Sequence, residues 1–198
     1  MFYKIKGNIM SIVRPIPTGK ETKLSSQQML VSKTNAKGII SFGNDTFVKV
    51  SGYSESEIIG EPHNILRHPD MPKAIFYLMW KSIKSGKNIM AVVKNLSKCG
   101  NHYWVTTDFE IRKDRDGRIQ SYIAFRQAAP RNVIKEIEPL YAKMLDIETN
   151  HGMDESLEYF YGCLDEKGMS YDEFIKDLAA PKGLAATFFT KMKELFPS

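Results

Sequence analysis

Four side chains suited to recognition chemistry fall within a short segment that runs from His63 to Asp70. The guanidinium of Arg67 offers paired donors and a fixed positive charge, which suit a pyrophosphate or the electron-rich edge of a ring. His68 follows it directly, and Asp70 could either contact a ligand or cap the helix that comes next. These residue types in this spacing make the segment the first candidate for a binding site.

The two histidines of this segment, His63 and His68, lie on either side of Arg67. By chemistry alone each could contact a flavin, serve as the axial ligand of a haem, or be a structural histidine whose ring nitrogens are satisfied. Most arginines lie at the protein surface, so Arg67 alone does not decide between these alternatives. All three interpretations stay open at the level of residue type.

Further candidates lie outside this segment. Asn44 and Asn95 each carry a donor and an acceptor, which suit the pyrimidine edge of a flavin, although Asn44 is also well placed to cap a helix. Tyr103 and Trp104 are neighbours in an expected strand, so their side chains must point to opposite faces. Trp80 lies on an apolar helical stripe, where a core position is the commoner role.

Apolar and β-branched runs predict the strands that position these residues, and turn-forming glycines separate several of the runs. We expect strands at residues 29–34, 39–42, 89–93, 103–111 and 119–125. Helical signals fill the interval between the second and third strands, namely a cap at Asn44, a capping box that begins at Ser54, and the stripe after Pro72. The order and the short connections predict an α+β domain, with a five-stranded antiparallel sheet and helices on one face.

The sequence after Pro130 changes to three- and four-residue apolar spacing, which predicts amphipathic helices with a kink or a break at Pro139. A capping box begins at Ser170, and a last helix is expected over residues 184–195. Residues 131–198 hold eight basic and thirteen acidic side chains, a net charge of −5 against +10 for the rest. We expect these helices to pack on the domain or on a partner and to regulate output without holding a ligand.

The composition excludes several classes of protein. The chain has 198 residues, of which 42% are hydrophobic and 26% charged, values typical of a globular protein. No apolar run is long enough for a membrane span or a signal peptide, so we expect a cytoplasmic protein. Two cysteines cannot build a disulfide framework. A net charge of +5 without a basic run or motif disfavours nucleic-acid binding, and no nucleophile–base arrangement or Walker loop favours an enzyme.

Five stretches of the sequence resemble the PAS domains of Aer-type energy-taxis (aerotaxis) receptors. The longest is GEPHNILRHPDMP at residues 60–72, which carries the His63–Asp70 segment. The others are NDTFVKVSGY at 44–53, VKN at 93–95, GNHYWV at 100–105 and EPLY at 138–141. The resemblance covers about residues 26–145 and implies the PAS fold, with an N-terminal arm (1–25), a sensor domain (26–128) and a helical C-terminal extension (129–198).

This resemblance implies non-covalent FAD, whose redox state the domain relays to a membrane chemoreceptor or another HAMP-containing signalling protein. It implies cofactor contacts by nine residues and no metal site. These are Asn44, His63, Arg67, His68, Asp70, Trp80, Asn95, Tyr103 and Trp104. The chain is closest to the split, CetB-like form, whose output domain is on another protein. We therefore expect membrane association only through a partner, without insertion, and a homodimer through the PAS domain.

One departure from the family pattern concerns the flavin itself. Ile89 stands where Aer-like proteins often carry tryptophan, so an aromatic partner for the ring is missing at this position. The alternative is a cofactor-free or haem-binding PAS module for protein–protein interaction, since a fold does not fix a function. No cysteine lies in residues 60–72, which disfavours a light-driven flavin adduct.

Overall fold

The computed structural model describes residues 14–179, and the last expected helix at residues 184–195 lies outside them. The strands are β1 (Leu30–Asn35), β2 (Ile40–Gly43), β3 (Ala91–Leu96), β4 (His102–Lys113) and β5 (Ile119–Ala128). The helices are α1 (Asp45–Ser51), α2 (Glu55–Ile58), the 3-10 helix η1 (His63–Leu66), α3 (Lys73–Lys84), α4 (Arg131–Asn150), α5 (Met153–Lys167) and α6 (Tyr171–Ala179).

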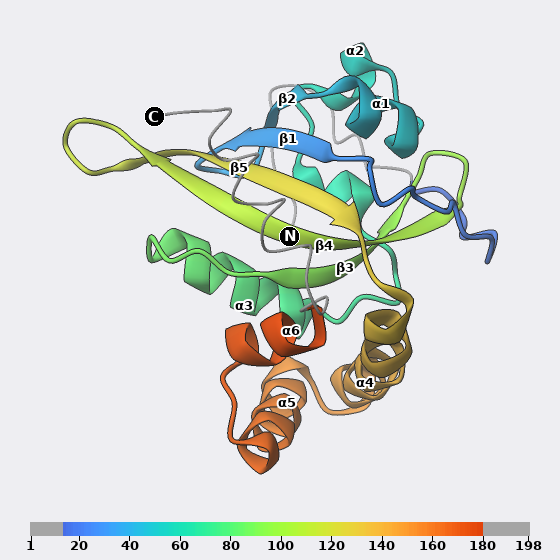
Figure 1. Cartoon of the computed structure of the whole chain (residues 1–198), viewed down its shortest axis with the longest axis vertical. Coiled ribbons are helices and arrows are strands. Elements are labelled where there is room, and N and C mark those ends of the chain that lie inside the picture. Colours follow the sequence, from blue (N-terminus) through green and yellow to red (C-terminus); the bar gives the residue numbers. More distant parts are fainter. Residues whose placement is uncertain (1–13, 180–198) are drawn as a thin grey trace.

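The five strands form one antiparallel sheet, as predicted, and the structure gives their order as β2-β1-β5-β4-β3 (Figure 1). The predicted strand ends were less accurate. β3 begins at Ala91 and continues through Leu96, because its pairing with β4 extends past the apolar run to Asn95 and Leu96. β5 continues to Ala128, three residues beyond the predicted end at Phe125. Backbone pairing, not hydrophobicity, sets where these strands end.

The predicted helix caps at the start of the domain are confirmed. The side chain of Asn44 accepts a hydrogen bond from the amide of Phe47, and Gly52 ends α1 in the left-handed conformation with φ 74°. Ser54 and Glu57 form the expected capping box of α2. Local sequence therefore determines the ends of these short helices.

The start of α3 differs from the prediction for Asp70. The N-cap of α3 is Pro72, which makes no side-chain cap. The free amides of Lys73 and Ala74 donate instead to the carboxylate of Glu148 in α4, at 3.0 and 3.1 Å. Asp70 is thus not the cap, because the carboxylate of Glu148, 75 residues beyond Lys73, accepts from these amides.

Helix α4 runs without a break from Arg131 to Asn150, with Pro139 inside it. Of the two predicted alternatives at Pro139, the break is therefore wrong, and the kink stays a prediction. Proline removes one helical hydrogen bond, but Ile137 and Tyr141 on either side of it are buried in the core. Their burial holds the helix together across the missing bond.

The three C-terminal helices lie together at the β3 end of the sheet (Figure 1). They cover an edge strand, whose outward backbone groups would otherwise be unpaired. The amide of Met90 donates to Asp172 of α6 at 3.3 Å, and the carbonyl of Val92 accepts from the Tyr141 hydroxyl of α4 at 3.0 Å. The amide of Lys94 lies 3.3 Å from the sulfur of Met71.

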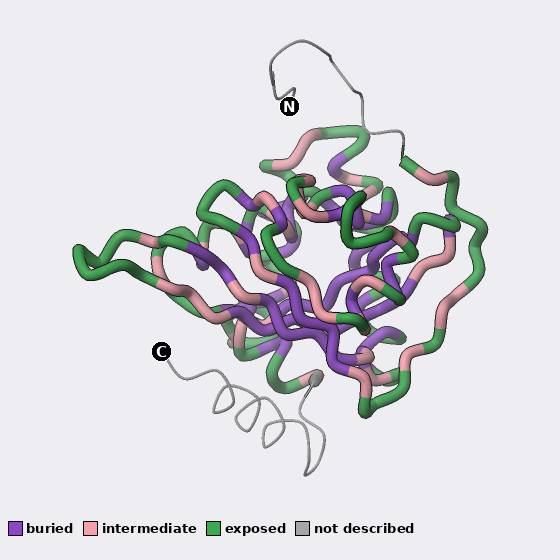
Figure 2. The backbone as a smooth tube through the Cα atoms, turned by 90° about the horizontal axis from the view of Figure 1, so that it is seen from above, coloured by how far each residue is buried: buried purple, intermediate pink, exposed green. Residues whose placement is uncertain are grey.

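One apolar core joins the sheet, α1, α3 and the C-terminal helices. Phe160 of α5 and Ile175 of α6 are fully buried in this core. Figure 2 shows that the buried positions concentrate in the central strands and that the loops are exposed. The C-terminal helices up to residue 179 therefore pack on the PAS-like sheet, which was one of the two predicted arrangements.

The N-terminal arm also contacts the domain. Thr18 donates from its amide to the carbonyl of Gly100, and the amide of His102 donates to the carbonyl of Lys20, both at 2.9 Å. Glu21 makes an ion pair with Arg131 at the start of α4. The arm thus lies beside the start of β4 and reaches the C-terminal extension.

Candidate functional site

The strand registers bring a group of polar side chains to one face of the sheet. Asn95 pairs with Tyr103, and Thr107 pairs with Arg126, which also pairs with Leu30. Directly paired residues point to the same face, and so do residues two or four apart on one strand. With His63 of η1, these side chains form what we call the inner-face cluster. Its members are Ser32, His63, Asn95, Tyr103, Thr107 and Arg126.

Arg126 lies at the centre of the inner-face cluster and is only 4% exposed. Its guanidinium donates to Ser32 Oγ at 2.8 Å, to the carbonyl of Ala124 at 3.4 Å, and to His63 Nε2 at 2.9 Å. Burial lowers the pKa of Arg126 to about 10, so the group stays charged at neutral pH. Within residues 14–179 it makes no ion pair with a carboxylate.

His63 is held neutral by this arrangement. A guanidinium can only donate, so Nε2 of His63 must accept, and the ring proton then lies on Nδ1. Desolvation and the charge of Arg126 hold the pKa of His63 well below its ordinary value. Because Nε2 is already engaged, His63 is poorly placed to be the axial ligand of a haem through that nitrogen.

Three members of the inner-face cluster carry buried polar atoms that find no partner in the described part of the chain. They are Asn95 Nδ2, Tyr103 Oη and Thr107 Oγ1. Burying such groups without a hydrogen bond costs about 1–3 kcal/mol each. Burial raises the pKa of Tyr103, which keeps its hydroxyl protonated and able to donate. One amide donor and two hydroxyl donors beside a guanidinium fit the carbonyl and ring-nitrogen acceptors of a flavin.

A second group of charged side chains lies where β3 meets α4. Lys94 is buried, and its ammonium makes ion pairs with Asp70 at 2.7 Å and with Glu138 at 3.5 Å. It also lies 5.6 Å from the centre of the Trp104 ring, which packs against Tyr141. We call the contacts that attach α4–α6 to the sheet and α3 the β3-edge junction. Its polar members are Lys94, Glu138, Tyr141, Glu148 and Asp172.

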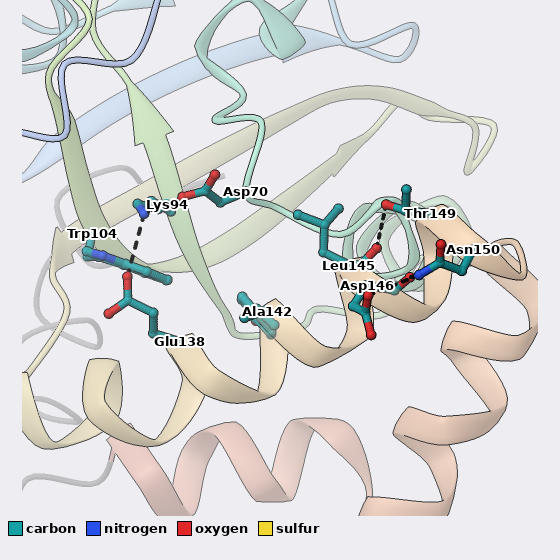
Figure 3. A pocket seen from close by; sticks show the side chains of 10 residues that line it. Asp70, Lys94, Trp104, Glu138, Ala142, Leu145, Asp146, Thr149 and Asn150 are labelled. Atoms are coloured by element: carbon teal, nitrogen blue, oxygen red, sulfur yellow. Dashed lines mark hydrogen bonds and ion pairs between the residues drawn. The ribbon is translucent and has the colours of Figure 1, made fainter.

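Figure 3 shows the pocket of about 590 Å³ beside this junction. Lys94 points toward Glu138, and Trp104 and Ala142 also line the pocket. Ten residues line the pocket, and seven of them belong to α4. These seven are Glu138, Tyr141, Ala142, Leu145, Asp146, Thr149 and Asn150. The pocket therefore lies against the C-terminal extension, away from the inner-face cluster.

His68 is buried beside the same loop. Its Nδ1 accepts from the amide of Asp70 at 3.1 Å, and its ring meets the ring of His102 edge-on with centroids 5.8 Å apart. Desolvation lowers the pKa of His68 to about 4, against a smaller opposing effect of the Asp70 carboxylate. His68 is thus a neutral hydrogen-bond acceptor at neutral pH.

Arg67 lies at the rim of the domain. Its Nη2 donates to the carbonyl of Met71 at 2.7 Å, and the guanidinium lies 4.8 Å from the ring centre of Phe76. Burial lowers its pKa, and the negative charge of Glu148 opposes that effect. Together with Arg14, Lys73 and other residues it lines a pocket of about 470 Å³. Its backbone forms a bridge with Asn95, so rim and inner face are directly connected.

Asn44 and Trp80 have structural partners. Asn44 accepts from the amides of Phe47 and Val31 and donates to the carbonyl of Met29, so its amide is fully engaged. Trp80 meets Tyr122 edge-on at 5.6 Å between centroids. It also packs so closely on the Gly38 turn that a Cβ there would lie 2.9 Å from the indole.

The nine predicted site residues are thus divided. His63, Asn95 and Tyr103 lie in the inner-face cluster, while His68, Asp70 and Trp104 lie at the β3 edge and Arg67 at the rim. Arg126, the centre of the cluster, was missed because the strand expected from the sequence ended at Phe125, one residue before it. Its alternation with Tyr122 and Ala124 would have placed it on the inner face.

No group of histidine, cysteine or carboxylate side chains in residues 14–179 could hold a metal ion. No helix in this part of the chain is long and apolar enough to cross a membrane.

Comparison with known proteins gives consistent matches. Residues 40–126 match the PAS fold family. The chain is 43% identical over 127 residues to the aerotaxis receptor of Escherichia coli (strain K12), covering 64% of this chain and 25% of the receptor. It is 27% identical over 93 residues to the bacterioopsin transcriptional activator of Halobacterium salinarum, covering 47% and 14%. The chain therefore spans about a quarter or less of these relatives.

Solved structures support the fold. A light-oxygen-voltage domain studied with a flavin analogue superposes with a TM-score of 0.50 at 20% identity, covering 56% of this chain and 84% of that domain. At this level of identity the similarity concerns the fold alone.

Proposed function

The chain contains a PAS domain similar to that of the aerotaxis receptor, and from this premise we propose that it binds FAD and relays the redox state of the flavin to a chemoreceptor-type partner. The observation that carries the proposal is the inner-face cluster. It combines a buried guanidinium with unpartnered atoms of Asn95, Tyr103 and Thr107, at the centre of a fold that similar domains use for sensing.

In this proposal the inner-face cluster holds the ring of the flavin. Asn95 and Tyr103 would donate to its polar edge, and Arg126, whose guanidinium donates to His63, would offer its positive charge to the same edge. Arg67 would contribute at the rim, where the rest of FAD would leave the core, and His68, Asp70 and Trp104 would contribute from the neighbouring β3 edge. The flavin supplies a redox state whose charge and hydrogen-bonding pattern change on reduction.

The residues of the chain offer a route from this site to the C-terminal helices. Arg67 and Asn95 share a backbone bridge, and the residue before Asn95 is Lys94, whose ammonium pairs with Glu138 of α4. Asp70 joins the same ammonium from the loop that carries Arg67. A change in the hydrogen bonds of Asn95 would therefore be felt at the start of the C-terminal extension, and a partner would detect the new position of these helices.

The partner in this proposal is a membrane-bound chemoreceptor or a HAMP-containing signalling protein, and the chain itself is a cytoplasmic sensor without enzymatic activity. A homodimer through the PAS domain is part of the same proposal. The relatives in the comparison are a receptor and regulators. These whole-protein roles extend beyond the quarter of the receptor that the chain matches.

The proposal is tested by purifying the protein, denaturing it and identifying the released chromophore by absorbance and chromatography. We expect stoichiometric FAD in the wild type and loss of FAD in Asn95→Ala. An exposed control, Asn64→Ala, should keep it. Haem in stoichiometric amount, or no chromophore after incubation with FAD, would overturn the proposal and favour a cofactor-free interaction module.

A further inference from the structure

We propose that Arg126 is the charge that favours the reduced, negatively charged form of the bound flavin, and that Arg67 at the rim does not have this role. This inference rests on the proposed binding of FAD, and it assigns the residue that sets the redox potential of the site. It follows from a comparison of the buried and half-buried cations around the sheet.

Two of these cations are already compensated within the protein. Lys94 makes ion pairs with Asp70 and Glu138. Arg67 donates to a backbone carbonyl, is partly exposed, and lies close enough to the buried carboxylate of Glu148 to be affected by its charge. An added negative charge beside either cation would compete with a carboxylate that is already in place.

Arg126 is more deeply buried than Arg67 and has no carboxylate partner among the described residues. Its described partners are a hydroxyl, a carbonyl and a neutral imidazole, and none of them carries a negative charge. A buried charge without a counter-ion costs several kcal/mol, so such a group is rare unless something else offsets the cost. The described part of the chain holds no carboxylate within ion-pair distance of this guanidinium.

The groups around Arg126 cannot supply the missing charge themselves. Burial raises the pKa of Tyr103, so its phenol stays neutral, and His63 is neutral because its Nε2 accepts from the guanidinium. Thr107, directly opposite Arg126 in the sheet, leaves its hydroxyl unpartnered. The cluster therefore has a net charge of +1 and free hydrogen-bonding atoms, which is complementary to an anion.

Reduction of a flavin by two electrons with uptake of one proton adds one negative charge to the ring, chiefly at the edge formed by N1 and the C2 carbonyl. The electrons come from a reduced electron carrier, for which dithionite substitutes in the test. In the low-dielectric interior Arg126 would interact more strongly with this charged ring than with the neutral oxidised one. A group that binds one redox form more tightly shifts the equilibrium toward that form.

The test is the midpoint potential of the purified flavoprotein at pH 7, titrated with dithionite against a reference dye. Arg126→Gln should disfavour the reduced form by at least tenfold, which lowers the potential of a two-electron couple by about 30 mV. Arg126→Lys keeps the charge and should retain most of the potential. Arg67→Gln removes the compensated cation of the rim and should shift the potential less than Arg126→Gln does, and the exposed Arg118→Gln is the control that should leave the potential unchanged.

A potential that shifts in Arg67→Gln and stays constant in Arg126→Gln would overturn the inference. If Arg126→Gln loses its flavin on purification, the dissociation constants of its apoprotein for oxidised and reduced FAD are measured under anaerobic conditions. We expect the reduced form to lose at least tenfold more affinity than the oxidised form. Equal losses for the two forms would show a merely structural role and would overturn the inference.

A failure of the proposed function gives a different result, because the wild type itself would then take up no FAD in either redox state. In that case the inference falls together with the proposed function. If the wild type binds FAD and only the Arg126 variants behave contrary to expectation, the proposed function stands and the inference alone is wrong.

Discussion

The inner-face cluster and the β3-edge junction are both buried and polar, yet they differ in how completely their hydrogen bonds are satisfied. At the junction, Lys94 has two carboxylate partners and Glu148 accepts from two backbone amides. In the cluster, Arg126 lacks a carboxylate among the described residues, and hydrogen-bonding atoms of Asn95 and Tyr103 have no partner there. The satisfied region joins parts of the protein, and the unsatisfied region has the character of a binding site.

The buried tyrosines Tyr103 and Tyr141 show this contrast, because the hydroxyl of one has a partner and that of the other has none among the described residues. Tyr141 donates to the carbonyl of Val92 at the sheet edge, and Tyr103 donates to no described atom. Burial raises the pKa of both phenols, so both remain donors at neutral pH. The same residue type therefore contributes stability in one region and unused binding capacity in the other.

The largest effect on stability is expected from a substitution in the apolar core of the C-terminal extension. Phe160→Ala removes a fully buried ring of α5 from the common core, and it should lower the free energy of unfolding by about 3–5 kcal/mol. The neighbouring Tyr161→Ala is the matched control, because Tyr161 is 43% exposed. Urea unfolding measures both. Equal effects of the two substitutions would contradict the packing of α5 on the domain.

Removal of the Glu148 carboxylate, which caps the start of α3, should have the next largest effect on stability. Glu148→Ala leaves the amides of Lys73 and Ala74 without a partner at the start of α3, so the free energy of unfolding should fall by about 1–3 kcal/mol. Glu136→Ala, at an exposed position of the same helix, should change it by less than about 0.5 kcal/mol. FAD content should not change in either variant if the junction and the cluster are separate.

Substitutions of Tyr141 and Tyr103 test the difference between the β3-edge junction and the inner-face cluster most directly. Tyr141→Phe loses a made hydrogen bond and should cost about 1 kcal/mol of stability with no loss of FAD affinity. Tyr103→Phe removes an unpartnered hydroxyl, so the stability of the apoprotein should stay the same or rise, while FAD should bind several-fold more weakly. Unfolding of the apoprotein and a flavin titration separate the two outcomes, and the reverse pattern would contradict the assignment of the two regions.

The last prediction concerns the dependence of stability on pH. In the folded protein the pKa of His68 is about 4, below its ordinary value of 6.5, so between these values the unfolded chain binds more protons. Stability contributed by neutral His68 is therefore present above pH 6.5 and is lost as the pH falls toward 4. His68→Gln should flatten the dependence of unfolding free energy on pH in this window. His151→Gln, at an exposed position, should leave it unchanged.

Local signals were sufficient for much of the fold. The turn glycines, the caps at Asn44 and Ser54, and the period of the apolar residues predicted five strands and the helices between them. Such signals act between residues a few positions apart, so they are readable without the rest of the structure. The segment around Arg67 was also identified from the sequence, although its division between rim, core and sheet edge was not.

Long-range pairing decided the rest. The sequence by itself shows an arginine at position 126, close to the end of an expected strand. Only the sheet register places this side chain between Thr107 and Leu30 and in contact with His63. Likewise, no local pattern connects Glu148 to the start of α3, because that contact depends on how α4 packs. Secondary structure follows from short-range propensities, whereas burial of a charge and the partner of a carboxylate depend on which distant segments the fold brings together.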